Sequence, residues 1–386
     1  MKKFVITILA IIALAQTAAA IPAFARKYGY SCEICHAPVP RLKAFGEEFM
    51  DNGYRIPDKE PPRATIDTGD PTLLLQRELP LAMRFDGYLA YEPNSAVKSD
   101  FRMPFAMKIV SGGNISEHVS YYAYFVMSED SKVVGIEDAY LYLHDLFGTP
   151  LSLSVGQFRI SDPIKATETR LTVENYMLFK FRVGESKLSL SYDRGIIAGY
   201  GTNFGTDFVL QLVNGNGIDE EEIFDSDKYK SVVYRAAQNL WKDNIRIGIL
   251  GYAGKEEGDG GATNSVTYFG PDVRLRLPNA ELLFEYVHRT DSNPLFVRAE
   301  FAPGGISHTT DAYLAEAVIA PRGDKSKTFY TVAYNRVDSS LASVDYQTLT
   351  FNVSHLLRRN LRLVAEYTHD LNGDFHRFMS GLMTAF

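Results

Sequence analysis

Two cysteines and a histidine stand close together near the N-terminus, in the sequence CEICH at residues 32–36. Two thiols at this spacing can each add to one vinyl group of the same porphyrin, and the adjacent imidazole can then reach the iron as an axial ligand. The motif therefore predicts one covalently attached haem c. Cys32 and Cys35 are the expected thioether residues, and His36 is the expected proximal ligand of the haem iron.

A disulfide, a redox-active CxxC pair and half of a zinc site are the alternatives for the same residues. Cys32 and Cys35 are the only cysteines in the 386-residue chain, and no further cysteine or histidine lies nearby at the spacing of zinc ligands. The motif also follows an export signal, and c-type haem is attached outside the cytoplasm. Together these observations favour haem.

The haem motif lies in a short segment, residues 26–56, which we interpret as a monohaem cytochrome c segment. Residues 41–50 predict a helix, because Leu42, Phe45 and Phe49 recur on one helical face. We expect Phe45 and Phe49 to pack against the apolar face of the haem.

Met50 is the only methionine of this segment and is a candidate distal ligand of the haem iron, because His/Met ligation is common in cytochromes c. The alternative is that Met50 is an apolar filler. Met83, His118 or an open coordination position are the other options for the sixth ligand.

Residues 1–25 read as a secretory signal peptide. A positive start is followed by an apolar run too short to span a membrane, and small residues permit cleavage after Ala20 or Ala25. The net charge of −7 leaves no basic surface to neutralise phosphates, so we expect no nucleic acid as partner.

From Leu79 to the C-terminus, apolar and polar residues alternate with a period of two, as the isoleucines of residues 245–249 illustrate. The chain has 24 Phe and 23 Tyr, yet its mean hydropathy is only −0.13, which suits strands with one lipid-facing side. We predict an all-β fold, a transmembrane antiparallel β-barrel of about 16 strands over residues 79–386, with a short N-terminal helical c-type haem segment and an irregular linker at 57–78.

The expected strand starts are near Leu79, Phe101, Ser116, Val133, Leu151, Leu188, Asp207, Lys230, Ile245, Val266, Glu281, Thr309, Thr328, Tyr346, Leu361 and Phe375. Residues 170–183 also look strand-like but would make the count odd, so we assign residues 161–187 to one long loop. With this assignment, short connections fall on the periplasmic side and long ones outside. The basic loop either folds into the lumen and constricts it or extends outside as a flexible loop.

The N-terminal segment is similar to a known family over about thirty residues. The shared residues are Pro22 to Gly29, the CEICH motif, Pro40, Leu42, Phe45-Gly46, Phe49 and Gly53-Tyr54. They resemble the fused monohaem cytochrome–porins of the bacterial outer membrane, a group that includes bacterial iron oxidases. The resemblance implies a barrel that carries electrons across the outer membrane through one haem held in or against its lumen.

The chain departs from the iron oxidases directly after the haem histidine, where residues 37–40 read APVP instead of aromatic and polar residues. The resemblance is therefore to the broader cytochrome–porin group. Separately, residues 156–159 (GQFR) and 192–195 (YDRG) are similar to anion-selective porins such as the phosphate-selective ones.

Two functions remain open. In the first, the protein is an electron-transfer oxidoreductase of the outer membrane, with ferrous iron (Fe2+) or another extracellular donor or acceptor on one side and periplasmic cytochromes on the other. In the second, it is an anion- or solute-selective porin that carries a haem-bearing plug or sensor segment.

Overall fold

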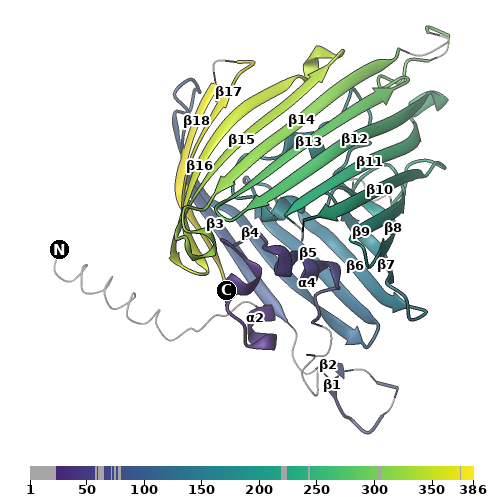
Figure 1. Cartoon of the computed structure of the whole chain (residues 1–386). Helices are drawn as coiled ribbons and strands as arrows, with labels where there is room; N and C mark the ends of the chain where they lie inside the picture. Colours follow the sequence, from purple (N-terminus) through teal and green to yellow (C-terminus); the bar gives the residue numbers. More distant parts are fainter. Residues whose placement is uncertain are drawn as a thin grey trace.

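The computed structural model describes residues 23–386 apart from 57–58, 60–64, 71, 74, 77–79, 219–223, 242–243, 299, 303–305 and 374. Most of the predicted signal peptide and part of the predicted linker therefore lie outside the described residues. Sixteen strands close into one antiparallel barrel in chain order, with β18 pairing back onto β3 (Figure 1). The predicted strand number is confirmed.

The barrel strands are β3 (Leu81–Tyr91), β4 (Ser99–Ser116), β5 (Val119–Glu129), β6 (Gly135–Leu146), β7 (Leu151–Arg159), β8 (Tyr192–Gly201), β9 (Thr206–Val213), β10 (Ser231–Leu240), β11 (Ile245–Glu257), β12 (Thr263–Leu277), β13 (Ala280–Asp291), β14 (His308–Ile319), β15 (Thr328–Ser339), β16 (Tyr346–Arg358), β17 (Leu361–Asp370) and β18 (Phe375–Ala385). All but one begin within three residues of the predicted start. The exception is the strand expected at Leu188, because β8 starts only at Tyr192. Leu188 and Leu190 are instead buried at the end of the preceding loop, where an extended backbone with alternating contacts produces the same pattern as a strand.

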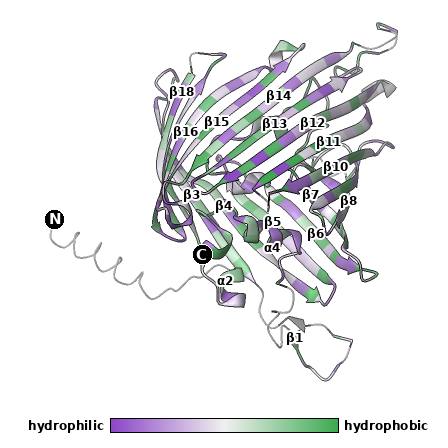
Figure 2. Cartoon of the chain, in the orientation of Figure 1, coloured by the Kyte–Doolittle hydropathy of each residue, from purple (hydrophilic) through white to green (hydrophobic). Residues whose placement is uncertain are grey.

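Alternation along the strands separates an outer apolar surface from a mixed interior (Figure 2). On β13, Leu282 and Phe284 point outward and are 41% and 43% exposed, whereas Glu281 and Glu285 point inward and are buried. A closed barrel leaves no unpaired strand edge, and its exposed apolar side chains match the lipid. This architecture places the chain in the outer membrane, with lipid around it.

The N-terminal segment lies at one mouth of the barrel, beside the lower ends of β4 and β5 in Figure 1. It contains the helices α2 (Ala23–Tyr28), α3 (Cys32–Cys35) and α4 (Ala44–Asp51). Short connections between strands surround it: Lys43 pairs with Asp324 at 2.6 Å, and Glu33 pairs with Arg359. Because short turns mark the periplasmic side of such barrels, this mouth is the periplasmic one.

Helix α4 begins three residues later than expected, because Leu42 forms an antiparallel bridge with His36 before the helix starts. The linker, predicted to be irregular, contains a small two-stranded sheet of β1 (Thr65–Ile66) and β2 (Leu75–Gln76). None of the helices in the described part of the chain has the length and apolar character that a bilayer-spanning helix needs.

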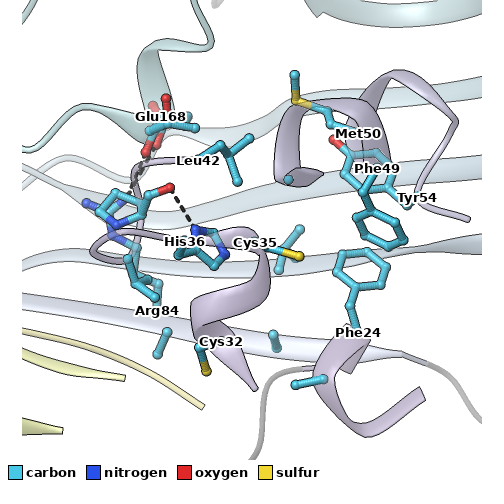
Figure 3. A pocket seen from close by; sticks show the side chains of 18 of the residues that line it. Phe24, Cys32, Cys35, His36, Leu42, Phe49, Met50, Tyr54, Arg84 and Glu168 are labelled. Atoms are coloured by element: carbon cyan, nitrogen blue, oxygen red, sulfur yellow. Dashed lines mark hydrogen bonds and ion pairs between the residues drawn. The ribbon is translucent and has the colours of Figure 1, made fainter. Parts of the chain in front are cut away.

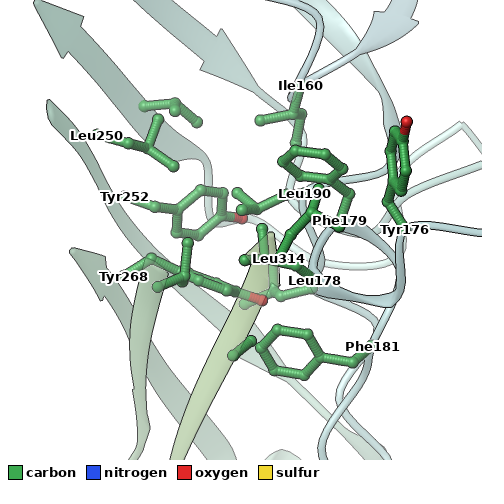
Figure 4. Close-up of a cluster of buried hydrophobic side chains, with 14 of the residues drawn as sticks. Ile160, Tyr176, Leu178, Phe179, Phe181, Leu190, Leu250, Tyr252, Tyr268 and Leu314 are labelled. Atoms are coloured by element: carbon green, nitrogen blue, oxygen red, sulfur yellow. The ribbon is translucent and has the colours of Figure 1, made fainter. Parts of the chain in front are cut away.

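Residues 160–191, between β7 and β8, run inside the barrel and form a plug (Figure 4). The plug includes the short helices η1 (Thr167–Thr169) and η2 (Met177–Phe179). Leu178, Phe179 and Phe181 are buried, and they belong to one apolar cluster with inward side chains of β9 to β15, including Tyr252, Tyr268 and Leu314. The plug is therefore packed against the inner wall of the barrel over these strands.

Polar contacts fix the plug to the rest of the wall. The Glu366 carboxylate on β17 accepts hydrogen bonds from the backbone N–H groups of Val173 and Glu174, at 2.6 and 2.9 Å. Arg289 on β13 is fully buried, and it donates to the Leu188 carbonyl at 2.8 Å as well as pairing with Asp291. With the apolar cluster reaching β9, these contacts to β13 and β17 mean that the plug touches strands on opposite sides of the barrel.

Candidate haem site at the periplasmic mouth

Residues 32–35 of the CEICH motif form helix α3, whose N-terminus is capped by the Ser31 hydroxyl accepting from the Glu33 N–H. His36 follows as the C-cap residue, and its Nδ1 lies 3.0 Å from the Pro40 carbonyl oxygen. Because a carbonyl oxygen can only accept, Nδ1 carries the proton and Nε2 keeps its lone pair. A backbone carbonyl that orients the imidazole in this way is the usual partner of a metal-ligating histidine.

Burial shifts the titration of all three motif side chains. It lowers the pKa of His36, which favours the neutral imidazole that can bind a metal. It raises the pKa of the thiols of Cys32 and Cys35, which are both free. A redox-active CxxC pair needs a lowered thiol pKa, so this environment argues against that alternative.

The three motif residues line one cavity of about 270 Å³ between the N-terminal segment and the inner wall of the barrel (Figure 3). The wall contributes side chains of β3 to β6, and the plug contributes Glu168 and Thr169. Phe45 and Phe49, the two predicted packing residues, line this cavity, and Phe49 is buried whereas Phe45 is 36% exposed. The volume lies just below the roughly 300–1,000 Å³ typical of ligand sites.

An aromatic cluster closes one side of the cavity. Phe24 packs against Phe49 and stacks on Tyr54, with ring centroids 5.1 and 5.4 Å apart. Tyr54 in turn stacks on Tyr122 of β5 at 4.4 Å, so the segment is joined to the barrel wall through its rings. Cleavage of the signal peptide after Ala25 would remove Phe24 from this cluster, whereas cleavage after Ala20 would keep it.

The structure sorts the candidates for a sixth iron ligand. Met50 and Met83 both line the cavity, and so does Met383 of β18, which sequence reasoning missed. Met50 also lines a neighbouring polar cavity, so its side chain lies between the two cavities. His118 is absent from the lining and lies instead at the rim of the barrel, with His144.

The donors present fit a haem c: two free thiols, an imidazole with an available Nε2, thioether sulfurs and an apolar lining around them. They do not fit zinc. Among the described residues, the group of three metal-ligating side chains with ligand atoms within 4.8 Å of one another is His118, His144 and Asp145, and it includes no residue of the CEICH motif.

Gly46 of α4 lies against the haem motif without room for a side chain. A Cβ atom there would stand 2.4 Å from the Cys35 carbonyl oxygen and 3.0 Å from Leu42. We expect Gly46→Ala to push α4 away from α3 and to cost about 1–3 kcal/mol, as overpacking usually does. The check is the yield of haem-stained protein and its visible spectrum. Glu48→Ala, on the exposed side of the same helix, is the matched control; equal yields for both variants would contradict the tight contact.

Ion pairs that cross the lumen anchor α4. Glu47 binds Arg274 at 2.7 Å and Arg276 at 2.6 Å, both on β12, and Arg276 also reaches Glu281 at 3.1 Å. Arg41 completes the network by binding Glu281 at 3.0 Å. The four partners in this network other than Glu47 are each at most 18% exposed, namely Arg41, Arg274, Arg276 and Glu281. The segment is therefore held by ion pairs that are largely shielded from water.

Glu47→Gln preserves the shape of this network but removes one negative charge between two arginines. We expect the docking of the segment to weaken by about 1.5–3 kcal/mol, the range for hydrogen bonds to charged groups. Limited proteolysis within residues 26–56 measures this as faster cleavage. Glu48→Gln, a few ångströms away on the exposed face, serves as control, and an unchanged cleavage rate in Glu47→Gln would show that the pairs do not hold the segment.

Glu168 of the plug joins the cavity to a cluster of cations. Its carboxylate lies 2.8 Å from Lys108 Nζ, 3.6 Å from Arg159 and 3.8 Å from both Arg84 and Arg170. Although burial opposes ionisation, Lys108 and the arginines hold the pKa of Glu168 well below its usual range. Glu168 therefore stays charged.

Sequence reasoning missed Arg84, Lys108 and Glu168 as residues of this cavity. Arg84 on β3 and Lys108 on β4 occupy inward positions in the alternating pattern of their strands. Many other charged residues of the barrel occupy such positions, so the pattern did not single these two out. The GQFR and YDRG segments, by contrast, lie side by side, because Gly156 pairs with Gly195 and Arg159 with Tyr192 in the β7–β8 ladder. Both segments flank the plug.

Comparison with known proteins supports the fold. No protein-family model and no curated protein matches the sequence. The anion-selective porin from Comamonas acidovorans is similar in structure, with a TM-score of 0.60 and 12% identity over 80% of this chain and 99% of that chain. The outer-membrane expressed OmpT of Vibrio cholerae has a TM-score of 0.56 and 11% identity, over 81% and 100% of the two chains.

The outer membrane channel DcaP of Acinetobacter baumannii is similar to the same degree, with a TM-score of 0.56 and 11% identity over 80% of this chain and 97% of that chain. At such identities the likeness concerns the fold alone. The chain has the fold of a 16-stranded outer-membrane porin.

Proposed function

We propose that this protein is a porin-fold outer-membrane cytochrome, in which one haem c sits in the periplasmic mouth and exchanges electrons between periplasmic cytochromes and an extracellular donor or acceptor. One observation carries the proposal: the CEICH motif lines a cavity that the N-terminal segment shares with the inner wall of the barrel. By itself, a segment of some thirty residues rarely sustains a core, and here the wall supplies the rest of the enclosure.

The residues around the cavity have separable roles. Cys32 and Cys35 would hold the group covalently, and His36 Nε2 would bind its iron, with the Pro40 carbonyl orienting the ring. Arg84 and Lys108 also line the cavity, where they are paired with Asp86 and Glu168, and a porphyrin carboxylate bound beside them would compete with these partners. A haem bound here supplies one-electron chemistry at its iron.

The packed plug supports electron transfer over solute passage. Apolar contacts and hydrogen bonds join residues 160–191 to strands on opposite sides of the barrel, so we expect the plug to block the lumen. Electrons can cross a filled protein interior, whereas hydrated solutes need a continuous aqueous path. The resemblance of the N-terminal segment to cytochrome–porins adds to this support.

The second candidate is an anion- or solute-selective porin with a haem-bearing plug. Its support is the fold, which is similar to that of the anion-selective porin from Comamonas acidovorans. Inward arginines such as Arg235 would then set the charge preference of the path, although Arg235 is paired with Asp272 at 2.6 Å.

Two measurements on the purified, haem-loaded protein separate the candidates. A redox titration with ferrous iron as donor should reduce the haem, and a planar bilayer should show no porin-like conductance. An open, ion-selective pore with a slowly reacting haem would favour the second candidate. A haem potential well below that of the ferric/ferrous couple at the working pH would exclude iron oxidation while leaving other donors and acceptors.

A further inference from the structure

Two histidines face each other at the periplasmic rim, in the connection between β4 and β5 and at the end of β6. The backbone N–H of His144 donates to the backbone carbonyl of His118 at 3.1 Å. This bond extends the β5–β6 ladder, in which Val119 pairs with Leu143. Side chains of directly opposite residues lie on the same face of a sheet, and the two imidazole centroids are 5.7 Å apart.

Asp145 adds a carboxylate to this pair. Its backbone has a φ of +54° and lies where the pairing of β6 with β7 shifts register, between Leu143 and Leu146. Its Oδ2 lies 2.9 Å from His144 Nδ1. One ligand atom from each of the three side chains lies within 4.8 Å of the other two.

His144 also has a nitrogen that nothing satisfies. Its side chain is only 4% exposed, and within the described residues its Nε2 has no hydrogen-bond partner. Buried polar atoms without a partner are uncommon and call for an explanation, such as a bound ion. This observation is independent of the spacing of the three side chains.

We propose that His118, His144 and Asp145 form a binding site for a divalent transition-metal cation. Two imidazoles and one carboxylate suit zinc, copper, nickel or iron, and not magnesium or calcium, which prefer oxygen ligands alone. Three protein ligands leave coordination positions open. Because His118 is exposed and a polar cavity of about 400 Å³ lies beside His144 and Asp145, such a cation can enter and leave.

Arg55 would compete with a metal cation for the Asp145 carboxylate. Its guanidinium forms an ion pair with Asp145, and it belongs to the N-terminal segment, close behind Gly53 and Tyr54. A metal cation and the guanidinium compete for the same carboxylate, so metal binding releases the Arg55 contact between segment and rim. The site stands on the barrel rim and does not depend on the proposed haem.

Zinc chloride alone is the probe, titrated calorimetrically into the full chain purified in detergent. We expect one zinc ion, bound on the order of tenfold or more weakly after His118→Ala or His144→Ala, and also weakened by Asp145→Asn. Arg55→Gln should bind zinc more tightly than the wild type, because it removes the competing charge. A role of these side chains in folding alone does not predict tighter binding by Arg55→Gln.

The matched control is the double variant His369→Ala/His376→Ala. These histidines also face each other across neighbouring strands, with rings stacked at 4.5 Å, but they belong to no group of three ligands among the described residues. Zinc binding should be unchanged in it. Cys32→Ser/Cys35→Ser should likewise retain the zinc site, which separates it from binding by thiols.

The proposal is overturned if wild-type protein binds no zinc, if His144→Ala binds it as well as the wild type, or if the His369/His376 variant or the double cysteine variant is the one that loses it. Weaker binding by Arg55→Gln would also contradict it. Heat-dependent migration on gels verifies that each variant is a folded barrel, so a loss of binding is scored only on folded protein.

Discussion

Cys32→Ser combined with Cys35→Ser is expected to abolish covalent haem attachment, so that denatured protein carries no haem stain. The reason is chemical: these are the only cysteines in the chain, and each is expected to form one thioether bond. The measurement is a haem-stained denaturing gel of membranes from cells that express the c-type maturation machinery, with total protein quantified by antibody.

Two further variants make this test specific. Ser31→Ala removes the cap of α3 but none of the attachment atoms, so it should keep the stain. His36→Ala should keep some covalent haem in the folded fraction but change its visible spectrum, because the proximal nitrogen is lost. Haem stain in the double cysteine variant would disprove the assignment of the motif.

Removing the centre of the plug is expected to open the barrel. Replacing residues 171–183 with a short Gly/Ser linker takes out the buried side chains of Leu178, Phe179 and Phe181, and the wild-type barrel, which we expect to be closed in a planar bilayer, should then conduct in porin-like steps. The fold should survive, because the sixteen-strand hydrogen-bond ladder does not include these residues. Single-channel recording measures the result.

A milder variant tests the same idea without a deletion. Phe179 is fully buried, and Phe179→Ala should destabilise the plug by about 3–5 kcal/mol, which predicts transient openings. Replacing residues 94–98, an exposed connection between β3 and β4, with Gly/Ser is the control and should remain closed. Porin-like conductance of the wild type would refute the closed plug and favour the solute-porin candidate.

Much of the barrel could be predicted because its signal is local. Alternation with period two depends only on which side of the wall a residue faces, so each strand can be predicted from its own residues, without knowing which strands it pairs with. The error at Leu188 and Leu190 has the same origin. Their alternation reflects burial in the plug, and a local pattern does not distinguish an extended loop inside the lumen from a strand in the wall.

The prediction of haem attachment is likewise local, because two thioether bonds and one axial ligand would need only five consecutive residues on a single turn of chain. The sequence alone therefore determined the strand pattern, which the barrel confirms, whereas the haem motif and the export signal stay predictions from it. The surroundings of the motif, by contrast, depend on residues far apart in the chain. Glu47 binds Arg274 across the lumen although 227 positions separate them.

Only the closed barrel decided which side chains share the cavity, what fills the lumen and which histidines meet at the rim. Contacts of this kind depend on strand register, on the tilt of the strands and on the path of the plug, since together these set which inward residues lie at the same depth. His118 and His144 are 26 positions apart, and a ladder hydrogen bond of 3.1 Å makes them neighbours.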